Sequence, residues 1–150
     1  MSVDVKAKLA ELGIELPEAA LPVAAYIPAV RTGNLVFTAG QLPLVKGAIP
    51  YVGKVDGGVT PEQAKEMAQV CILNAIAAVG LVADINNIER VVQVRGFVNG
   101  VTGFVGHPGV VNGASELLVE IFGEAGKHVR AAVGVNELPL GASVEIEFTA

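Results

Sequence analysis

Apolar positions that recur at intervals of three and four residues predict helices in three parts of the chain. Residues 3–12 carry Val5, Leu9 and Leu12 along one side. This spacing is typical of a short amphipathic helix, and Gly13 is expected to end it.

The longest helical pattern starts at Thr60, where three helix-start signals coincide. Thr60 can cap the backbone, Pro61 suits the first helical position, and Gln63 completes a capping box. An apolar stripe then continues for about five turns; it comprises Ala64, Met67, Ala68, Cys71, Ile72, Ala75, Ile76 and Val79. A further helix is predicted over 111–125, ended by Gly126. Both helices are expected to pack one face on a sheet.

Alternating and β-rich segments predict the strands. Residues 24–43 contain two β-rich segments separated by the turn letters "TGN", which is typical of a hairpin. Residues 41–59 are rich in glycine and proline and predict a loop crossing with a short strand near Tyr51. Residues 88–98 alternate as a further strand. The final residues, 126–150, contain two more strand segments, which are predicted to pair with each other.

This order of elements predicts a single α+β domain over residues 1–150, with 1–20 as an N-terminal helical extension. Neighbouring strands joined by short turns imply one mixed or antiparallel sheet, with the two longer helices on a single face. The other face would have no cover within the chain. We therefore expect subunits to associate there.

The composition supports association. The chain is 52% hydrophobic and 17% charged, and its mean hydropathy is +0.57. A lone monomer would have trouble covering so much apolar surface with so few charges. We therefore expect an oligomer whose interface is as apolar as a core.

Charge and apolar run lengths exclude several classes of function. The net charge is −5 without any cluster of basic residues, which argues against a nucleic-acid partner. The longest apolar run, near residues 75–83, is shorter than the roughly 20 residues that a membrane span needs. Residues 1–13 lack a signal-peptide pattern, and a single cysteine cannot form a disulfide within the chain. The sequence predicts a soluble cytoplasmic protein with no membrane partner.

Most conventional chemistries lack a motif. His107 and His128 have no metal-ligand spacing and are interpreted as a loop histidine and a strand-edge histidine. Cys71 lies on the inward stripe of the long helix, where a free cysteine behaves as a small buried hydrophobe. The glycines of residues 103–109 lack phosphate-loop spacing, and no serine lies in a nucleophile elbow. The sequence therefore supports no metal site, nucleotide site or covalent nucleophile.

Two charges interrupt the closing strand segments. Arg130 shares one side of its segment with Ala132 and Gly134, whereas Glu145 alternates with apolar residues in the next segment. A hairpin turning at 138–141 would place Glu145 opposite Gly134, about 13 Å from Arg130. The two charges would then bracket a ligand or meet through different subunits, and a guanidinium above small residues suits bidentate capture of a carboxylate. A solvated face with incidental charges is the alternative.

Three features occur together between Pro22 and Phe148: "AYIPAVRTGNLVFTAGQLP", "GFVNGVTGFVGHPGVVNGASELLVEIFGEAGKHVRAAVGVNELPLGASVEIE" and the helix between them. The most specific positions are Gly33, Asn34, Gly40, Gln41, Pro43, Arg130, Leu138, Pro139 and Glu145. With these features the chain resembles the RidA/YjgF family, also labelled L-PSP endoribonuclease, and particularly its longer members. The resemblance implies a chorismate-mutase-like fold assembled as a homotrimer, with an inner barrel of sheets and a cleft at each subunit interface.

The activity implied by this resemblance is hydrolysis of reactive 2-imino or enamino acids to 2-keto acids and ammonia, without a cofactor. By position, Arg130 would hold the substrate carboxylate, and Glu145 would position or activate the attacking water. Tyr26 would close the cleft of the neighbouring subunit. The other substrate-binding positions are Ala39, Gly40, Asn112, Ala132 and Pro139. No covalent nucleophile is needed, because the imine carbon is already electrophilic.

Two positions depart from the family pattern. Ala39 replaces a hydroxyl near the ligand, and Ala132 stands where many members carry cysteine. Both changes make the pocket more apolar, so a second hypothesis is a non-enzymatic trimer that binds or senses a small carboxylate. The ribonuclease label is a third hypothesis, opposed by the net charge of −5 and the lack of a basic groove. The sequence also leaves chaperone-like behaviour open.

Overall fold

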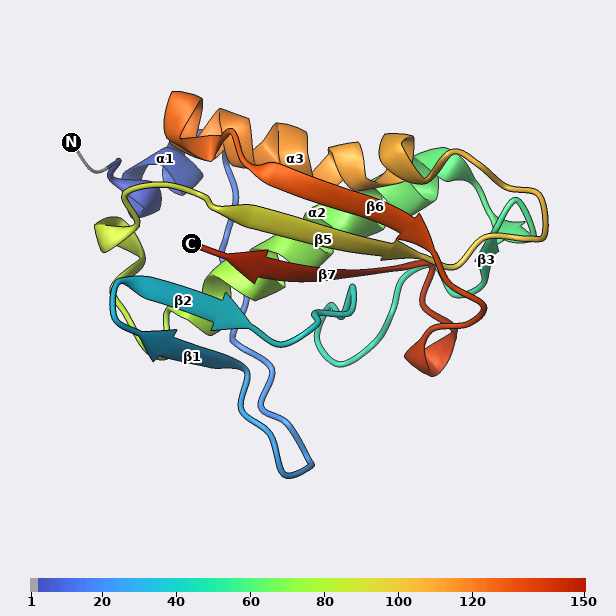
Figure 1. Cartoon of the computed structure of the whole chain (residues 1–150), viewed down its shortest axis with the longest axis horizontal. Helices are drawn as coiled ribbons and strands as arrows, with labels where there is room; N and C mark the ends of the chain where they lie inside the picture. Colours follow the sequence, from blue (N-terminus) through green and yellow to red (C-terminus); the bar gives the residue numbers. More distant parts are fainter. Residues whose placement is uncertain (1–2) are drawn as a thin grey trace.

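The structure, a computed structural model, describes residues 3–150 (Figure 1). Residues 1 and 2, the start of the predicted N-terminal extension, lie outside the described residues. The main sheet has the strand order β1-β2-β7-β5-β6. Its strands are β1 Ala29–Thr32, β2 Leu35–Thr38, β5 Gln93–Val98, β6 Val129–Gly134 and β7 Val144–Thr149, and β3 Lys54–Val55 and β4 Gly58–Val59 form a separate small sheet. The helices are α1 Val5–Glu11, α2 Pro61–Val79 and α3 His107–Phe122, with short 3-10 turns η1 Ile85–Asn87, η2 Gly123–Gly126 and η3 Pro139–Gly141. Over residues 3–150, no helix combines the length and apolar character that crossing a membrane requires.

The capping box predicted at Thr60 is present. Its Oγ1 accepts a hydrogen bond from the backbone N–H of Gln63 at 3.1 Å, and its own N–H donates to Oε1 of Gln63 at 3.0 Å. Pro61 occupies the first helical position. The start of the long helix is therefore confirmed, because these three residues satisfy backbone groups that would otherwise lack partners.

The helix predicted over 111–125 begins earlier, at His107. Pro108 in the first turn needs no N–H partner and has the backbone angle of a helix, so it favours this earlier start. The interpretation of His107 as a loop residue is therefore wrong. The helix ends at Phe122, because Gly123 adopts a positive φ of 61°.

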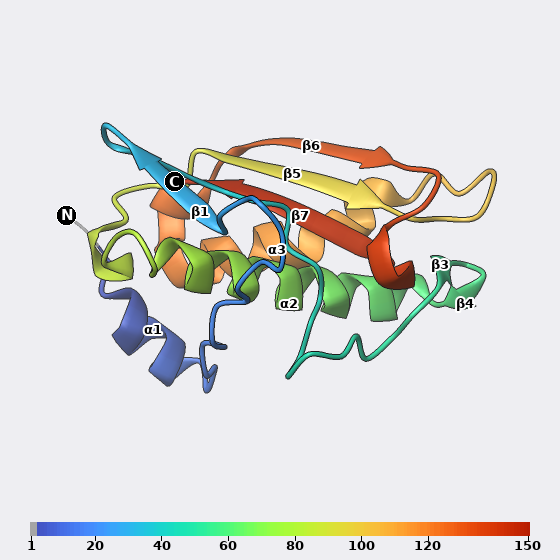
Figure 2. The same ribbon diagram turned by 90° about the horizontal axis from the view of Figure 1, so that it is seen from below.

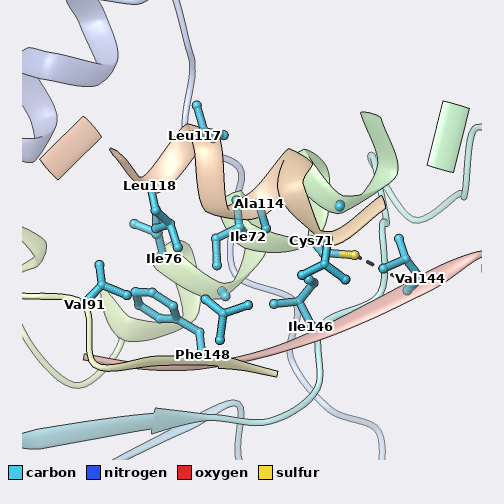
Figure 3. Packing of buried hydrophobic residues seen from close by; sticks show 14 of the residues in the cluster. Cys71, Ile72, Ile76, Val91, Ala114, Leu117, Leu118, Val144, Ile146 and Phe148 are labelled. Atoms are coloured by element: carbon cyan, nitrogen blue, oxygen red, sulfur yellow. Dashed lines mark hydrogen bonds between the residues drawn. The ribbon is translucent and has the colours of Figure 1, made fainter. Parts of the chain in front are cut away.

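The core lies between the two long helices and one face of the sheet (Figure 2). Figure 3 shows Val144, Ile146 and Phe148 of β7 directed at the helices, and all three are buried. Opposite them lie Cys71, Ile72 and Ile76 of α2 and Ala114, Leu117 and Leu118 of α3. The helices approach closely at Gly113, where a Cβ would overlap the carbonyl oxygen of Lys65. This one-sided packing confirms the predicted α+β layers.

Within residues 3–150, no helix covers the opposite face of the sheet (Figure 2). Its exposed large apolar side chains include Leu35, Phe37, Val129 and Val133. Among them, Nη1 of Arg95 and Oε2 of Glu147 form an ion pair at 3.3 Å. The uncovered apolar face predicted from the sequence is therefore present.

The predicted hairpin within residues 24–43 is confirmed, since β1 and β2 pair antiparallel around Gly33, whose φ is 58°. The short strand predicted near Tyr51 lies three residues later, at Lys54–Val55. Pro50 has no N–H for a ladder, and Gly53 has a φ of 134°, so the strand begins only after Gly53.

The predicted pairing of the last two strands is also wrong. The strand β5 lies between them, parallel to β6 and antiparallel to β7. Because α3 connects β5 to β6, this connection is a strand–helix–strand crossover, which brings its two strands together in parallel. The other edge of β5 is then available to β7. Residues 135–143 pass the end of β5, where the N–H of Asn99 donates to the carbonyl oxygen of Ser143.

Candidate functional site

Arg130 lies on the edge strand β6, on the side that faces the helices. It pairs with buried Val94, so the two side chains point to the same side of the sheet. Its Nη1 donates to Oδ1 of Asn112 at 2.7 Å and to Oγ of Ser115 at 3.3 Å. Asn112 and Ser115 share one face of α3, because residues three apart on a helix are neighbours. The guanidinium is thus attached to α3 while it stays exposed.

The same network continues to His128. Its Nε2 lies 2.9 Å from Oγ of Ser115, and its Nδ1 lies 2.6 Å from the carbonyl oxygen of Gly126. Sequence reasoning assigned no site role to Ser115 or His128. Two spacing signals could have found them. His128 precedes Arg130 by two residues, the spacing at which side chains of an extended segment point the same way, and Asn112 and Ser115 are at helical spacing.

Glu145 lies on β7 and points to the uncovered face. Its neighbours Val144 and Ile146 are fully buried under the helices, so strand alternation turns Glu145 the other way. A Cβ on Gly40 would lie 2.5 Å from Oε1 of Glu145, so glycine leaves the room that this carboxylate occupies. The segment that contains Gly40 is joined to β7 at Gln41, through backbone hydrogen bonds of 2.8 and 3.1 Å with Ile146.

The carboxyl of Glu145 is electrostatically perturbed. Partial burial raises its pKa above the ordinary value, and repulsion from the carboxylate of Glu147 adds to the effect. A carboxyl in this environment accepts a proton more readily than a solvated one. It is therefore suited to acid–base chemistry.

Arg130 and Glu145 do not meet within one copy of the chain. Arg130 and Phe148 both pair with Val94 of β5, whereas Glu145 and Val133 both pair with Phe97. The two charges therefore lie on opposite faces of the sheet, with β5 between their strands. The expected position of Glu145 opposite Gly134 is wrong, because β6 and β7 are not neighbours.

Some of the other predicted residues accompany these two charges. Asn112 contacts Arg130 directly, and Ala132 follows Arg130 by two positions on the same side of β6. Gly40 lies against the acid on β7, and Ala39 directly precedes it. One copy therefore carries two separate groups of candidate residues.

Tyr26 and Pro139 belong to neither group within one copy. Tyr26 is 57% exposed and lies in the segment that extends away from the sheet before β1 (Figure 1). Pro139 begins the turn η3, in which Leu140 has a positive φ of 58°. The predicted roles of Tyr26 and Pro139 in substrate binding remain predictions.

Cys71 is a buried core residue, as predicted. Its Sγ donates to the carbonyl oxygen of Val144 at 3.7 Å. Burial raises the pKa of its thiol, and the negative charge of Glu145 adds to this effect, which keeps the sulfur protonated. Across residues 3–150, His, Cys, Asp and Glu side chains form no group of three that could hold a metal ion.

The protein is therefore of the α+β class, with one mixed sheet, its long helices on one face of that sheet and Arg130 on an edge strand. A family model described as "YjgF/chorismate mutase-like, putative endoribonuclease" matches residues 6–148. The chain belongs to this family, so the RidA/YjgF resemblance and the chorismate-mutase-like fold are confirmed.

Individual relatives agree with this assignment. The chain is 37% identical over 145 residues to protein TCP17 of Trypanosoma cruzi, with 95% of this chain and 91% of that protein covered. It is 30% identical over 129 residues to a RutC family protein of Pyrococcus horikoshii, with 86% and 88% covered. The crystal structure of a "putative endoribonuclease" from Shewanella oneidensis MR-1 has a TM-score of 0.92 at 31% identity, with 97% of each chain covered.

Proposed function

We propose that this protein is a hydrolase that deaminates reactive 2-imino or enamino acids to 2-keto acids and ammonia, and so limits metabolite damage. The hydrogen bonding of the Arg130 guanidinium is the observation that supports the proposal. Nη1 is bound to α3, whereas no acceptor from residues 3–150 engages Nε or Nη2. A guanidinium held in this way offers a planar pair of donors, which suits the carboxylate of an imino acid.

In the proposed reaction, Arg130 binds the substrate carboxylate and Glu145 accepts a proton from water as the water oxygen attacks the imine carbon. The C–O bond forms while the π electrons of the C=N bond move to nitrogen, which takes up a proton. The C–N bond then breaks, ammonia leaves, and the carbonyl forms. One imine and one water give one keto acid and one ammonia. The raised pKa of Glu145 supports its acid–base role.

We further propose that the complete site forms between copies of a homotrimer. Arg130 and Glu145 lie on opposite faces of one copy, so a second copy is needed to bring them together. The uncovered apolar face supports such an assembly, and Tyr26 would close the cleft of a neighbour. Native mass spectrometry is expected to give three times the 15.4 kDa mass of the chain. A monomer at all concentrations would contradict the assembly.

The activity is tested by generating 2-iminobutanoate with a dehydratase and following the release of keto acid or ammonia. Purified protein is expected to accelerate release, and Arg130→Ala is expected to abolish the acceleration. Arg31→Ala is the matched control, because Arg31 is an exposed arginine on the other edge strand, β1. Equal acceleration by Arg130→Ala would refute the proposal.

The second candidate is a trimer that binds a small carboxylate without turnover. It is favoured by Ala132, which adds no polar group on the side of β6 that carries Arg130, and by the loss of the hydroxyl at Ala39. Pyruvate would then raise the thermal unfolding midpoint of the protein, while the imine assay showed no acceleration. Both results together would favour this candidate over the deaminase.

A further inference from the structure

The side chains around Arg130 leave only one pair of its donors available. The guanidinium has five N–H groups. Both N–H groups of Nη1 are used, by Oδ1 of Asn112 at 2.7 Å and by Oγ of Ser115 at 3.3 Å. A carboxylate can bind a guanidinium end-on, through Nη1 and Nη2, or side-on, through Nε and Nη2. With Nη1 occupied, only the side-on pair remains.

The direction of the hydrogen bonds follows from the carbonyl oxygen of Gly126, which can only accept. Nδ1 of His128, 2.6 Å away, must therefore carry the hydrogen. In a neutral imidazole this leaves Nε2 as an acceptor, so the hydroxyl of Ser115 donates to it across 2.9 Å. The lone pairs of Ser115 then remain for Arg130. Because a guanidinium can only donate, Ser115 accepts from Nη1, and His128 determines where the hydroxyl hydrogen of Ser115 points.

We propose that Ser115 and His128 are positioning residues that restrict Arg130 to the side-on mode, so that a ligand carboxylate is bound through Nε and Nη2. This proposal rests on the carboxylate-binding role of Arg130 in the proposed function. Its physical reason is the freedom of an exposed arginine on an edge strand, whose guanidinium would otherwise rotate about its long side chain. Three linked hydrogen bonds from Gly126 to Nη1 remove that freedom before the ligand arrives, and such preorganisation favours binding.

Two kinds of variant separate the hydrogen bonds of this network. In His128→Gln, the side-chain oxygen can occupy the position of Nε2 and still accept from Ser115. In His128→Asn, the shorter amide can still donate to the carbonyl oxygen of Gly126 but does not reach Ser115. Ser115→Ala removes the relay and keeps α3 intact, because alanine is the best helix former. Glu120→Gln, at an exposed position of the same helix, is the surface control.

The test is calorimetric titration of pyruvate into the full-length chain, with thermal unfolding as a check on folding. Ser115→Ala is expected to weaken pyruvate binding about 10-fold, the effect of one lost hydrogen bond to a charged group. His128→Asn is expected to weaken binding as well, because the hydroxyl of Ser115 loses the acceptor that orients it. His128→Gln is expected to recover most of this loss. In nitrogen-15 NMR spectra, Nη1 and Nη2 of Arg130 are expected to be distinct in the wild type and to average in Ser115→Ala, which a merely structural role would not cause.

Each outcome distinguishes this proposal from the proposed function. Wild-type affinity in folded Ser115→Ala and His128→Asn overturns the positioning role, whether or not the protein hydrolyses imines. If pyruvate binding depends on both residues but no imine hydrolysis occurs, the positioning role holds and the deaminase proposal fails. If Arg130→Ala binds pyruvate as tightly as the wild type, both proposals fail.

Discussion

The two charged groups of this protein, at Arg130 and at Glu145, are supported in opposite ways. Neutral side chains of α3 hold the guanidinium of Arg130 through Nη1. Glu145 receives no hydrogen bond or salt bridge from residues 3–150, and it lies beside Gly40 with Glu147 as a nearby like charge. The first arrangement preorganises donors for an anion, whereas the second favours uptake of a proton. In the proposed function, binding and proton transfer would therefore be assigned to different faces of the sheet.

The largest effect is expected from removing either charge. Arg130→Ala and Glu145→Gln are each expected to lower kcat/KM for 2-iminobutanoate at least about 100-fold, because one loses the charged anchor and the other the acid–base group. Pyruvate titration is expected to separate them: binding is lost in Arg130→Ala and retained in Glu145→Gln. Loss of binding in both variants would contradict the division between the two faces.

A smaller effect is expected from Gly40→Ala. The added Cβ would lie 2.5 Å from Oε1 of Glu145, so the carboxylate must move. We expect turnover to fall about 10-fold through misplacement of the acid, with pyruvate binding unchanged. Gly109→Ala is the control, because a Cβ there meets no atom within 4 Å. Equal kinetics for the two alanine variants would refute the packing argument.

Mixing two inactive variants tests whether the faces meet between copies. When Arg130→Ala and Glu145→Gln chains are unfolded together in equal amounts and refolded, about three quarters of random trimers contain both chains, and each mixed trimer has one intact interface of three. Activity is therefore expected to return to about a quarter of the wild-type value. If the complete site lay within one chain, mixing would restore no activity.

The smallest effect concerns stability and pH. Because the pKa of Glu145 is raised in the folded state, folded protein binds the Glu145 proton at a higher pH than unfolded protein does. The free energy of unfolding of the wild type therefore falls as pH rises from the ordinary pKa of 4.5 through the raised value. Glu145→Gln lacks this loss and is expected to be the more stable protein at pH 7. Urea unfolding at pH 5 and pH 7 measures the difference. An advantage of the variant that does not grow with pH would contradict the expectation.

Local sequence signals predicted features within single helices and strands more successfully than the geometry of the site. The capping box at Thr60 and the burial of Cys71 depend on residues within one helix, and both are confirmed. Alternation also placed Arg130 and Ala132 on one side of their strand. Ser115 was not predicted as a site residue, because its partner His128 becomes a neighbour only when α3 packs beside β6.

By itself, the sequence determined the presence of the helices, the β1–β2 hairpin, the residues that share a side with each charge within its strand, and the family. These features depend on neighbours a few residues apart or on the pattern of residues along the chain. Only the tertiary structure decided that Arg130 and Glu145 lie on opposite faces. The reason is that the α3 crossover places β6 parallel to β5 and leaves the other edge of β5 to β7. No local pattern in the last two strands encodes the strand that lies between them.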